Sequence, residues 1–296
     1  MIRVTRRGFA ALAGGTVLAR KALAQNDAAP LIERAIPSSG ERLPAVGLGT
    51  AQIFDSNDER TQHAAAQVIG TLAEAGGRVV DTASSYGEAE TVLGNAITRA
   101  ALRDKLFIAT KLEEPDAAEL KRSLTRLAKL DLLQLHNVRD PQQSLAQFKA
   151  WQAHGLCRYI GITSTFRGDF AAVEAVLGRE RPDFVQIGYS LDDREAEKRI
   201  LPLAAEVKAG VLTALPFGHG RLFRAVRGQA IPAWATGFAG SWAQFFLKYL
   251  LGDERVTAVI PGTSDPAHMA DNLGAMRGAL PDQEQRKRMA AFIDGL

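Results

Sequence analysis

The chain of 296 residues contains one cysteine, Cys157, which excludes an intramolecular disulfide and any metal site built from several thiolates. Cys157 lies just before a predicted strand, so we expect a buried structural thiol without chemistry of its own. His63, His154 and His219 have no partners at the spacing of metal ligands. The sequence therefore predicts no metal centre.

The sequence also lacks a basic surface of the kind that binds nucleic acid. Its composition is ordinary for a globular protein, with 46% hydrophobic and 23% charged residues and a formal net charge of +3. Part of the basic excess lies at the N-terminus, in Arg3, Arg6, Arg7, Arg20 and Lys21. Elsewhere Lys and Arg alternate with Asp and Glu instead of clustering with aromatic residues, so we expect no nucleic-acid partner.

No hydrophobic run near the N-terminus is long enough to span a membrane. Residues 1–24 instead have the order of a signal peptide: basic residues, a weakly apolar run over residues 8–19, and small residues before Gln25. Residues 5–9, Thr-Arg-Arg-Gly-Phe, resemble the twin-arginine signal that exports folded proteins. We therefore expect the twin-arginine export machinery as a partner and a periplasmic location. A plain basic N-terminus, with the protein in the cytoplasm, is the alternative.

A glycine fingerprint for a dinucleotide is also missing. Gly47-Leu48-Gly49 is followed by Thr-Ala-Gln, without a third glycine and without a helix directly behind it. This absence disfavours an open, doubly wound sheet with a separate cofactor domain.

What the sequence does contain is a regular alternation of short apolar runs and longer amphipathic stretches. Such alternation is typical of parallel strands joined by crossover helices. The expected strands cover residues 45–49, 78–81, 106–110, 130–136, 159–163, 183–188, 211–215 and 256–261. The expected helices cover residues 61–75, 88–100, 116–127, 142–154, 168–177, 196–209, 241–251 and 266–277.

Eight strand–helix units of this size predict an α/β fold, a (β/α)8 TIM barrel, as a single domain over residues 25–296. A β-hairpin around the turn at residues 37–40 precedes the barrel, and a short helix over residues 281–293 follows it. Phe245, Phe246 and Tyr249 fall at helical spacing and are expected in the core. Residues 218–224, after the seventh strand, are expected to form a flexible loop that shapes the pocket, with a plain surface loop as the alternative.

Polar residues suited to catalysis stand where the strands end. Asp81 ends the second strand, Lys111 follows the third, and His136 ends the fourth, while Tyr86 lies in the loop after Asp81. These ends meet at the mouth of a barrel, where active sites lie. Each residue alone is compatible with a structural role. Together they predict an ion pair between Lys111 and Asp81, with the cation lowering the pKa of the Tyr86 phenol from about 10 and the imidazole orienting a substrate oxygen.

Three stretches, residues 81–90, 108–111 and 131–137, resemble the aldo-keto reductase family. The resemblance continues through residues 161–164, 185–186 and 260–264 and covers about residues 43–280. It implies hydride transfer between a nicotinamide cofactor and a small carbonyl or alcohol substrate. Tyr86 would be the general acid, Lys111 paired with Asp81 would tune it, and His136 would bind the carbonyl oxygen.

The resemblance also implies two sets of cofactor residues. Those expected around the nicotinamide are Gly49, Thr50, Asp81, Thr163, Ser164 and Gln186. Those expected along the phosphates and adenosine are Pro216, Phe217, Gly218, Thr263, Ser264, His268, Asp271 and Asn272.

This sequence departs from the family at the cofactor. Ala214 stands where an aromatic residue usually stacks on the nicotinamide, Gly262 replaces a Lys, and His268 replaces an Arg. The resemblance implies NADP as the cofactor, and these departures weaken that preference, so NAD is possible. The chain also ends without a long substrate loop, which predicts an open pocket.

Two further classes of function are compatible with such a barrel. One is a cofactor-binding barrel with little turnover, which senses redox state or serves as a scaffold. The other is a barrel isomerase or hydrolase, which needs metal ligands or paired carboxylates at the strand ends. Asp81 is the single carboxylate expected there, so the reductase interpretation is favoured.

Overall fold

The computed structural model describes residues 29–296, and the predicted leader at residues 1–24 lies outside this range. Eight parallel strands form one sheet in the order β10-β9-β8-β7-β6-β5-β4-β3, so neighbours in space follow one another in sequence. Their bounds are β3 Leu48–Gly49, β4 Val79–Asp81, β5 Phe107–Leu112, β6 Leu132–Leu135, β7 Tyr159–Ser164, β8 Phe184–Gly188, β9 Gly210–Ala214 and β10 Ala258–Val259.

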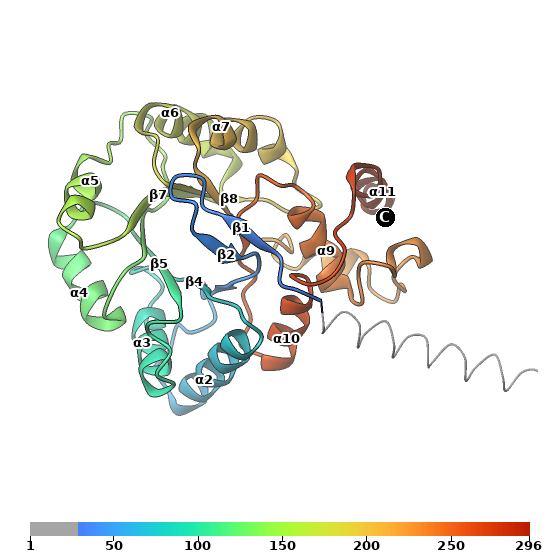
Figure 1. Cartoon of the computed structure of the whole chain (residues 1–296), viewed down its shortest axis with the longest axis horizontal. Coiled ribbons are helices and arrows are strands. Elements are labelled where there is room, and N and C mark those ends of the chain that lie inside the picture. Colours follow the sequence, from blue (N-terminus) through green and yellow to red (C-terminus); the bar gives the residue numbers. More distant parts are fainter. Residues whose placement is uncertain (1–28) are drawn as a thin grey trace, which may run out of the picture.

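The sheet closes on itself between its first and last strands. Parallel bridges join Val46 to Val259 and Gly49 to Gly262, and the Gly49 amide donates to the carbonyl of Pro261 at 3.0 Å. A Cβ on Gly49 would lie 2.9 Å from the Ile260 carbonyl oxygen, so glycine permits this close approach. The predicted (β/α)8 barrel is confirmed, and Figure 1 shows it as a ring of helices around the strands.

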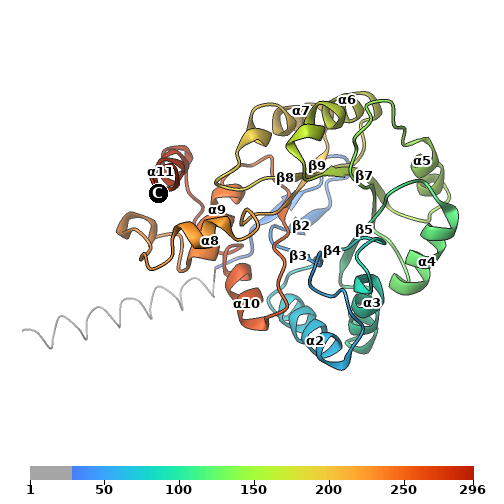
Figure 2. The same cartoon turned by 180° about the vertical axis from the view of Figure 1, so that it is seen from behind.

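The helices lie outside the strands, as both faces of the barrel show (Figures 1 and 2). Their bounds are α2 Glu59–Glu74, α3 Ala89–Arg99, α4 Ala117–Leu127, α5 Ala146–Ala153, α6 Phe170–Glu180, α7 Ile200–Val207, α8 Arg221–Ala225, α9 Trp242–Leu251, α10 Pro266–Gly274 and α11 Gln283–Asp294. Short 3-10 turns lie at Arg167–Asp169, Glu195–Glu197 and Ala233–Ala235.

The helix starts follow from side-chain caps. Asp58, Asp116, Ser241 and Asp265 each accept a hydrogen bond from a backbone amide in the first turn of the helix that they precede. Such a cap satisfies a donor that the helix cannot pair internally. Asp282 goes further and forms a capping box at the start of α11.

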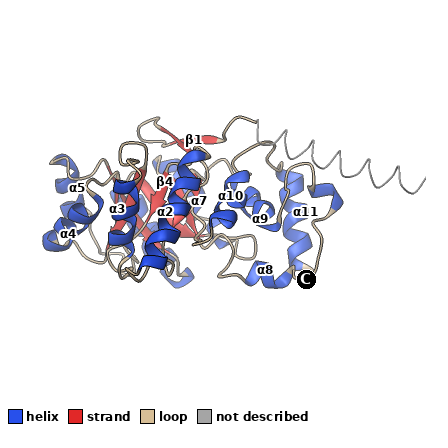
Figure 3. Cartoon of the chain, turned by 90° about the horizontal axis from the view of Figure 1, so that it is seen from below, coloured by secondary structure: helices blue, strands red, loops and turns tan. Residues whose placement is uncertain are grey.

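The predicted hairpin is present as β1 Glu33–Ala35 and β2 Arg42–Pro44. It lies across one rim of the barrel (Figure 3), where Ile36 and Leu43 join the apolar cluster inside the strands. The Tyr159 hydroxyl donates to Ser39 at 2.8 Å, and Tyr159 begins β7. The hairpin therefore covers the amino-terminal end of the strands and leaves the carboxyl end for the site.

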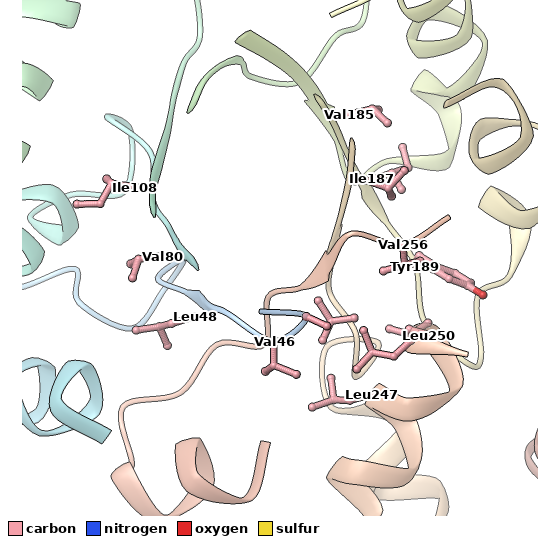
Figure 4. Close-up of a cluster of buried hydrophobic side chains, with 14 of the residues drawn as sticks. Val46, Leu48, Val80, Ile108, Val185, Ile187, Tyr189, Leu247, Leu250 and Val256 are labelled. Atoms are coloured by element: carbon pink, nitrogen blue, oxygen red, sulfur yellow. The ribbon is translucent and has the colours of Figure 1, made fainter. Parts of the chain in front are cut away.

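The apolar core has two layers. Inside the strands, a plug includes Val79, Phe107 and Phe184. Outside them, residues such as Val80 and Ile108 pack against the helices, and Figure 4 shows part of this outer layer. The two layers follow from the strand period of two, which sends neighbouring side chains to opposite faces. The predicted core positions Phe245, Phe246 and Tyr249, on α9, are buried, as is Cys157.

Several predicted boundaries differ from the structure. The helix expected from residue 142 begins at Ala146, and the one expected over residues 196–209 is a 3-10 turn followed by α7. Residues 218–224 are not a loop throughout, because α8 begins at Arg221. Lys111 does not follow its strand but lies within β5, which runs on to Leu112 because it pairs with β6 that far.

Among the described residues, no helix is both long and apolar enough to cross a bilayer.

Helices α3 and α4 approach closely at Gly94, where an added Cβ would overlap the carbonyl oxygen of Arg126. We expect Gly94→Ala to lower the free energy of unfolding by about 1–3 kcal/mol, because the two helices must move apart. The matched control is Gly70→Ala on α2, where an added Cβ meets no atom within 4 Å. That change is expected to stabilise by roughly 0.5–1 kcal/mol through helix propensity. Urea unfolding of both variants tests this pair, and equal effects would contradict it.

Candidate active site

The inner face of the strands changes from apolar to polar toward the carboxyl end of the barrel. On β4, Val79 lies in the inner plug, Val80 faces the helices, and Asp81 comes next. On β5, Ala109 lies in the plug, and Lys111 follows it two residues later. Alternation therefore places Asp81 and Lys111 inside the barrel, directly above its apolar plug.

The two charges form a buried ion pair. Lys111 Nζ lies 2.6 Å from Asp81 Oδ2, and their side chains are 1% and 4% exposed. Nζ also donates to the Thr82 carbonyl at 2.7 Å. Gln134 and Gln186 donate to the two carboxylate oxygens of Asp81 at 3.3 and 3.2 Å. A buried pair needs such extra partners, because removing two ions from water is costly.

Burial is the largest single influence on the pKa of Lys111 and lowers it, but Asp81 and Tyr86 together outweigh burial and the pKa lies above its ordinary value. The structure therefore favours the charged form of Lys111 in the barrel mouth. The predicted pairing of Lys111 with Asp81 is present in the structure.

Tyr86 comes from the loop between β4 and α3, which is held over β5 by the Ser84 amide and hydroxyl, both donating to the Lys111 carbonyl. Lys111 Nζ lies 5.1 Å from the centre of the Tyr86 ring. The centre of the His136 ring lies 5.7 Å from the centre of the Tyr86 ring, and the two rings meet edge to face. The four predicted catalytic residues are thus brought together, with Tyr86 between the cation and the imidazole.

The expected lowering of the Tyr86 pKa is not observed. Burial raises the pKa of this phenol, and the opposing charge of Lys111 does not cancel the effect because Asp81 neutralises part of it. Tyr86 is consequently a protonated phenol at neutral pH.

Glu113, which is not among the expected site residues, contacts His136. Glu113 Oε1 lies 2.8 Å from His136 Nδ1, and the Ser85 hydroxyl donates to the same oxygen at 3.1 Å. The sequence spacing hinted at this position, since Glu113 comes two residues after Lys111 and residues two apart on a strand point to the same face. The contact itself needed the fold, because His136 comes from the neighbouring strand end.

The catalytic residues open into a cavity of about 610 Å³. Its lining includes Asp81, Tyr86, Lys111 and His136. The predicted cofactor residues that also line it are Gly49, Thr50, Thr163, Gln186 and Phe217. Ala214 lines it as well, at the position where the family usually has an aromatic ring.

An adjoining cavity of about 500 Å³ shares Phe217 and Gly262 with the first. The other predicted cofactor residues that line it are Thr263, His268, Asp271 and Asn272. Phe223 and Trp242 form aromatic walls. In the described part of the chain, neither Lys nor Arg lines this second cavity.

Four predicted cofactor residues lie away from these two linings. Gly218 lines a smaller neighbouring cavity. Pro216 and Ser264 line none of the three cavities. The Ser164 hydroxyl donates to Asp169 at 2.7 Å, which turns it from the cavity toward the loop behind β7. Their roles toward a cofactor stay predictions.

The described residues contain no group of three or more His, Cys, Asp or Glu arranged to hold a metal ion.

Comparison with known proteins agrees with this architecture. The model of the aldo/keto reductase family matches residues 45–293. An aldo-keto reductase of Mycolicibacterium smegmatis is 30% identical over 249 residues, which are 78% of this chain and 81% of that protein.

Two crystal structures of aldo-keto reductase from Klebsiella pneumoniae have the same fold. One, in complex with NADPH, is 24% identical with a TM-score of 0.70. The other, in complex with NADP and acetate, is 23% identical with a TM-score of 0.72. Each alignment covers 89% of this chain and 96% of the other. The family model spans most of the barrel and all four residues of the site, so this chain belongs to the aldo/keto reductase family.

Proposed function

We propose that this protein is an NAD(P)-dependent oxidoreductase that interconverts an aldehyde or ketone with an alcohol, using Tyr86 as general acid and base. The observation that carries the proposal is the convergence of Tyr86 with Lys111, Asp81 and His136 in one cavity. A barrel that only sensed or displayed a cofactor would need no proton donor beside a buried cation, so turnover is the better interpretation.

The cavities suit a nicotinamide dinucleotide. Gln186 donates through its amide nitrogen to Asp81, while its buried carbonyl oxygen has no hydrogen-bond partner within residues 29–296 and would accept from a carboxamide NH2 group. The buried Thr50 hydroxyl likewise has no partner among the described residues. These residues would hold the nicotinamide end, and the adjoining cavity lined by Phe217 and Asn272 would hold the adenosine end. The related Klebsiella structures, which contain NADPH or NADP, support this choice.

When bound, the cofactor supplies the hydride. The chain supplies the proton and its control. Tyr86, whose pKa is raised by burial, holds its proton near neutral pH and can donate it to the developing alkoxide of a reduced substrate. The fixed charge of Lys111 then stabilises the phenolate that is left, and burial of that charge strengthens the stabilisation. His136 orients the substrate oxygen toward Tyr86.

Twin-arginine export is a separate part of the proposal. The motif at residues 5–9 supports it, and the route would allow a folded barrel to carry its cofactor out of the cytoplasm. The protein would then be periplasmic, and its cofactor would be recycled on the enzyme by a second substrate.

We expect Tyr86→Phe to lower kcat for reduction of an aromatic aldehyde by about 100-fold or more, because the proton donor is lost. The Kd of the cofactor should change by no more than about twofold, since the ring that fills the cavity is kept. Steady-state assays and a fluorescence titration with NADPH measure the two effects. Normal turnover in this variant would refute the assignment.

NADPH is expected to bind with little preference over NADH. His268, 75% exposed, is the basic residue at the adenosine end of the cavity, and an exposed pair contributes about 1 kcal/mol or less. The ratio of the two Kd values should therefore stay below about tenfold. His268→Ala should weaken NADPH alone, with NADH as the internal control. A ratio above about 100 would show that another cation holds the 2′-phosphate.

Replacing Arg6 and Arg7 by Lys is expected to keep the protein in the cytoplasm of a bacterial host, because the twin-arginine pair is the recognised element of the signal. Arg3→Lys, which leaves the pair intact, is the matched control. Cell fractionation followed by immunoblotting measures the distribution. Equal periplasmic amounts of the unchanged protein, the Arg3→Lys control and the variant with Lys at positions 6 and 7 would exclude this route.

A further inference from the structure

Glu113 and His136 form a pair at the rim of the cavity. His136 is 11% exposed and Glu113 is 48% exposed, and 2.8 Å separates the carboxylate oxygen from Nδ1. The Ser85 hydroxyl lies 3.1 Å from the same oxygen and 3.4 Å from Nδ1. The hydrogen bond from Ser85 thus helps to hold the Glu113 carboxylate against Nδ1.

This geometry decides where the proton of the imidazole lies. An ionised carboxylate has acceptors only, so a contact of 2.8 Å requires a proton on Nδ1. In a neutral imidazole with that proton, Nε2 carries a lone pair and can accept but not donate. Donation from Nε2 to a carbonyl oxygen then requires the doubly protonated ring.

We propose that Glu113 is a positioning residue that holds the proton of His136 on Nδ1 and supports the charged form of the ring. The charged ring donates a hydrogen bond from Nε2 to the oxygen of a carbonyl substrate, and the neutral ring cannot. The proton that is transferred passes between Tyr86 and the substrate oxygen, so His136 keeps its own protons through the step. The rate of carbonyl reduction thereby depends on the protonation of His136. This inference rests on the proposed function for the identity of the substrate.

The surroundings of His136 explain why a carboxylate is needed. Burial and the nearby Lys111 charge both lower the pKa of His136, and Glu113 and Asp81 oppose them without cancelling them, so the pKa lies below its ordinary value. Asp81 is already engaged by Lys111 at 2.6 Å. Tyr86 faces the ring as an uncharged phenol, so Glu113 is the anion in direct contact with it.

The sign of the expected pH effect follows. Glu113→Gln removes an influence that raises the pKa of His136, so the charged ring is lost at a lower pH than in the unchanged protein. Carbonyl reduction then falls off at a lower pH. A structural role for Glu113 would change the rate at every pH alike.

The experiment compares Glu113→Gln with Glu114→Gln in the full barrel. Glu114 is the next residue and is exposed, and in residues 29–296 it forms no ion pair with His136. Nitrogen NMR of histidine-labelled protein follows the His136 nitrogens across pH without any substrate. We expect the titration midpoint of His136 to fall by about one unit in Glu113→Gln, the lower end of the effect of an opposite charge, because Glu113 is half exposed.

Activity gives the second readout. Above both midpoints, a shift of one unit means about tenfold lower kcat/KM for carbonyl reduction, with the limb of the pH profile displaced equally. Glu114→Gln should match the unchanged protein in both measurements. Circular dichroism confirms that each variant is folded.

The outcomes are distinct. If Glu113→Gln keeps the midpoint, the proton pattern on Nδ1 and the pH limb, the inference is overturned even when the enzyme is active. If the unchanged protein reduces no carbonyl compound, the proposed function fails, while the NMR titration still decides whether Glu113 controls His136.

Discussion

The ion pair between Lys111 and Asp81 is the interaction around which the rest of the site is arranged. It lies inside the barrel next to the apolar plug and is almost completely buried, so both charges depend on partners from the protein. Gln134 and Gln186 complete the partners of Asp81, and the Thr82 carbonyl completes those of Lys111. Because these groups come from four strands and a loop, the pair is satisfied only when the barrel is closed. The same loop continues to Tyr86, so satisfying the cation also places the phenol.

The molecule separates stability from chemistry along the barrel axis. The hairpin and the aromatic plug, including Phe107 and Phe184, occupy the amino-terminal end of the strands. The polar residues occupy the carboxyl-terminal end, where loops of different origin meet. Alternation along each strand produces both halves, with mostly apolar side chains outward against the helices. Substitutions in one half can therefore change folding or catalysis with little effect on the other.

The expected departures from the family pattern lie at the two cavities. Ala214 lines the first, and Gly262 and His268 line the second, whose walls include aromatic rings but, within residues 29–296, neither Lys nor Arg. Glu113 lies apart from these positions and brings a carboxylate to the His136 imidazole. The departures bear on the proposed choice of dinucleotide, and Glu113 bears on the proposed control of the His136 proton.

Much of this protein could be predicted from its sequence. The period of the apolar residues determined eight strands and eight helices, and hence the barrel. The positions of Asp81, Lys111 and His136 at or next to strand ends favoured their meeting, although Lys111 lies within β5 and not after it. These features are local, because a strand end and its facing direction depend on neighbouring residues only.

Other features depended on the tertiary structure. The contact between Glu113 and His136 joins residues beyond the ends of two strands, and no local sequence pattern gives the distance between them. The Ser164 hydroxyl turned toward Asp169, although its position in the sequence suggested the cavity. The pKa of Tyr86 is raised, although the nearby lysine suggested the opposite. Burial decides that direction, and burial is the sum of contacts with segments distant in sequence, which only the closed barrel brings together.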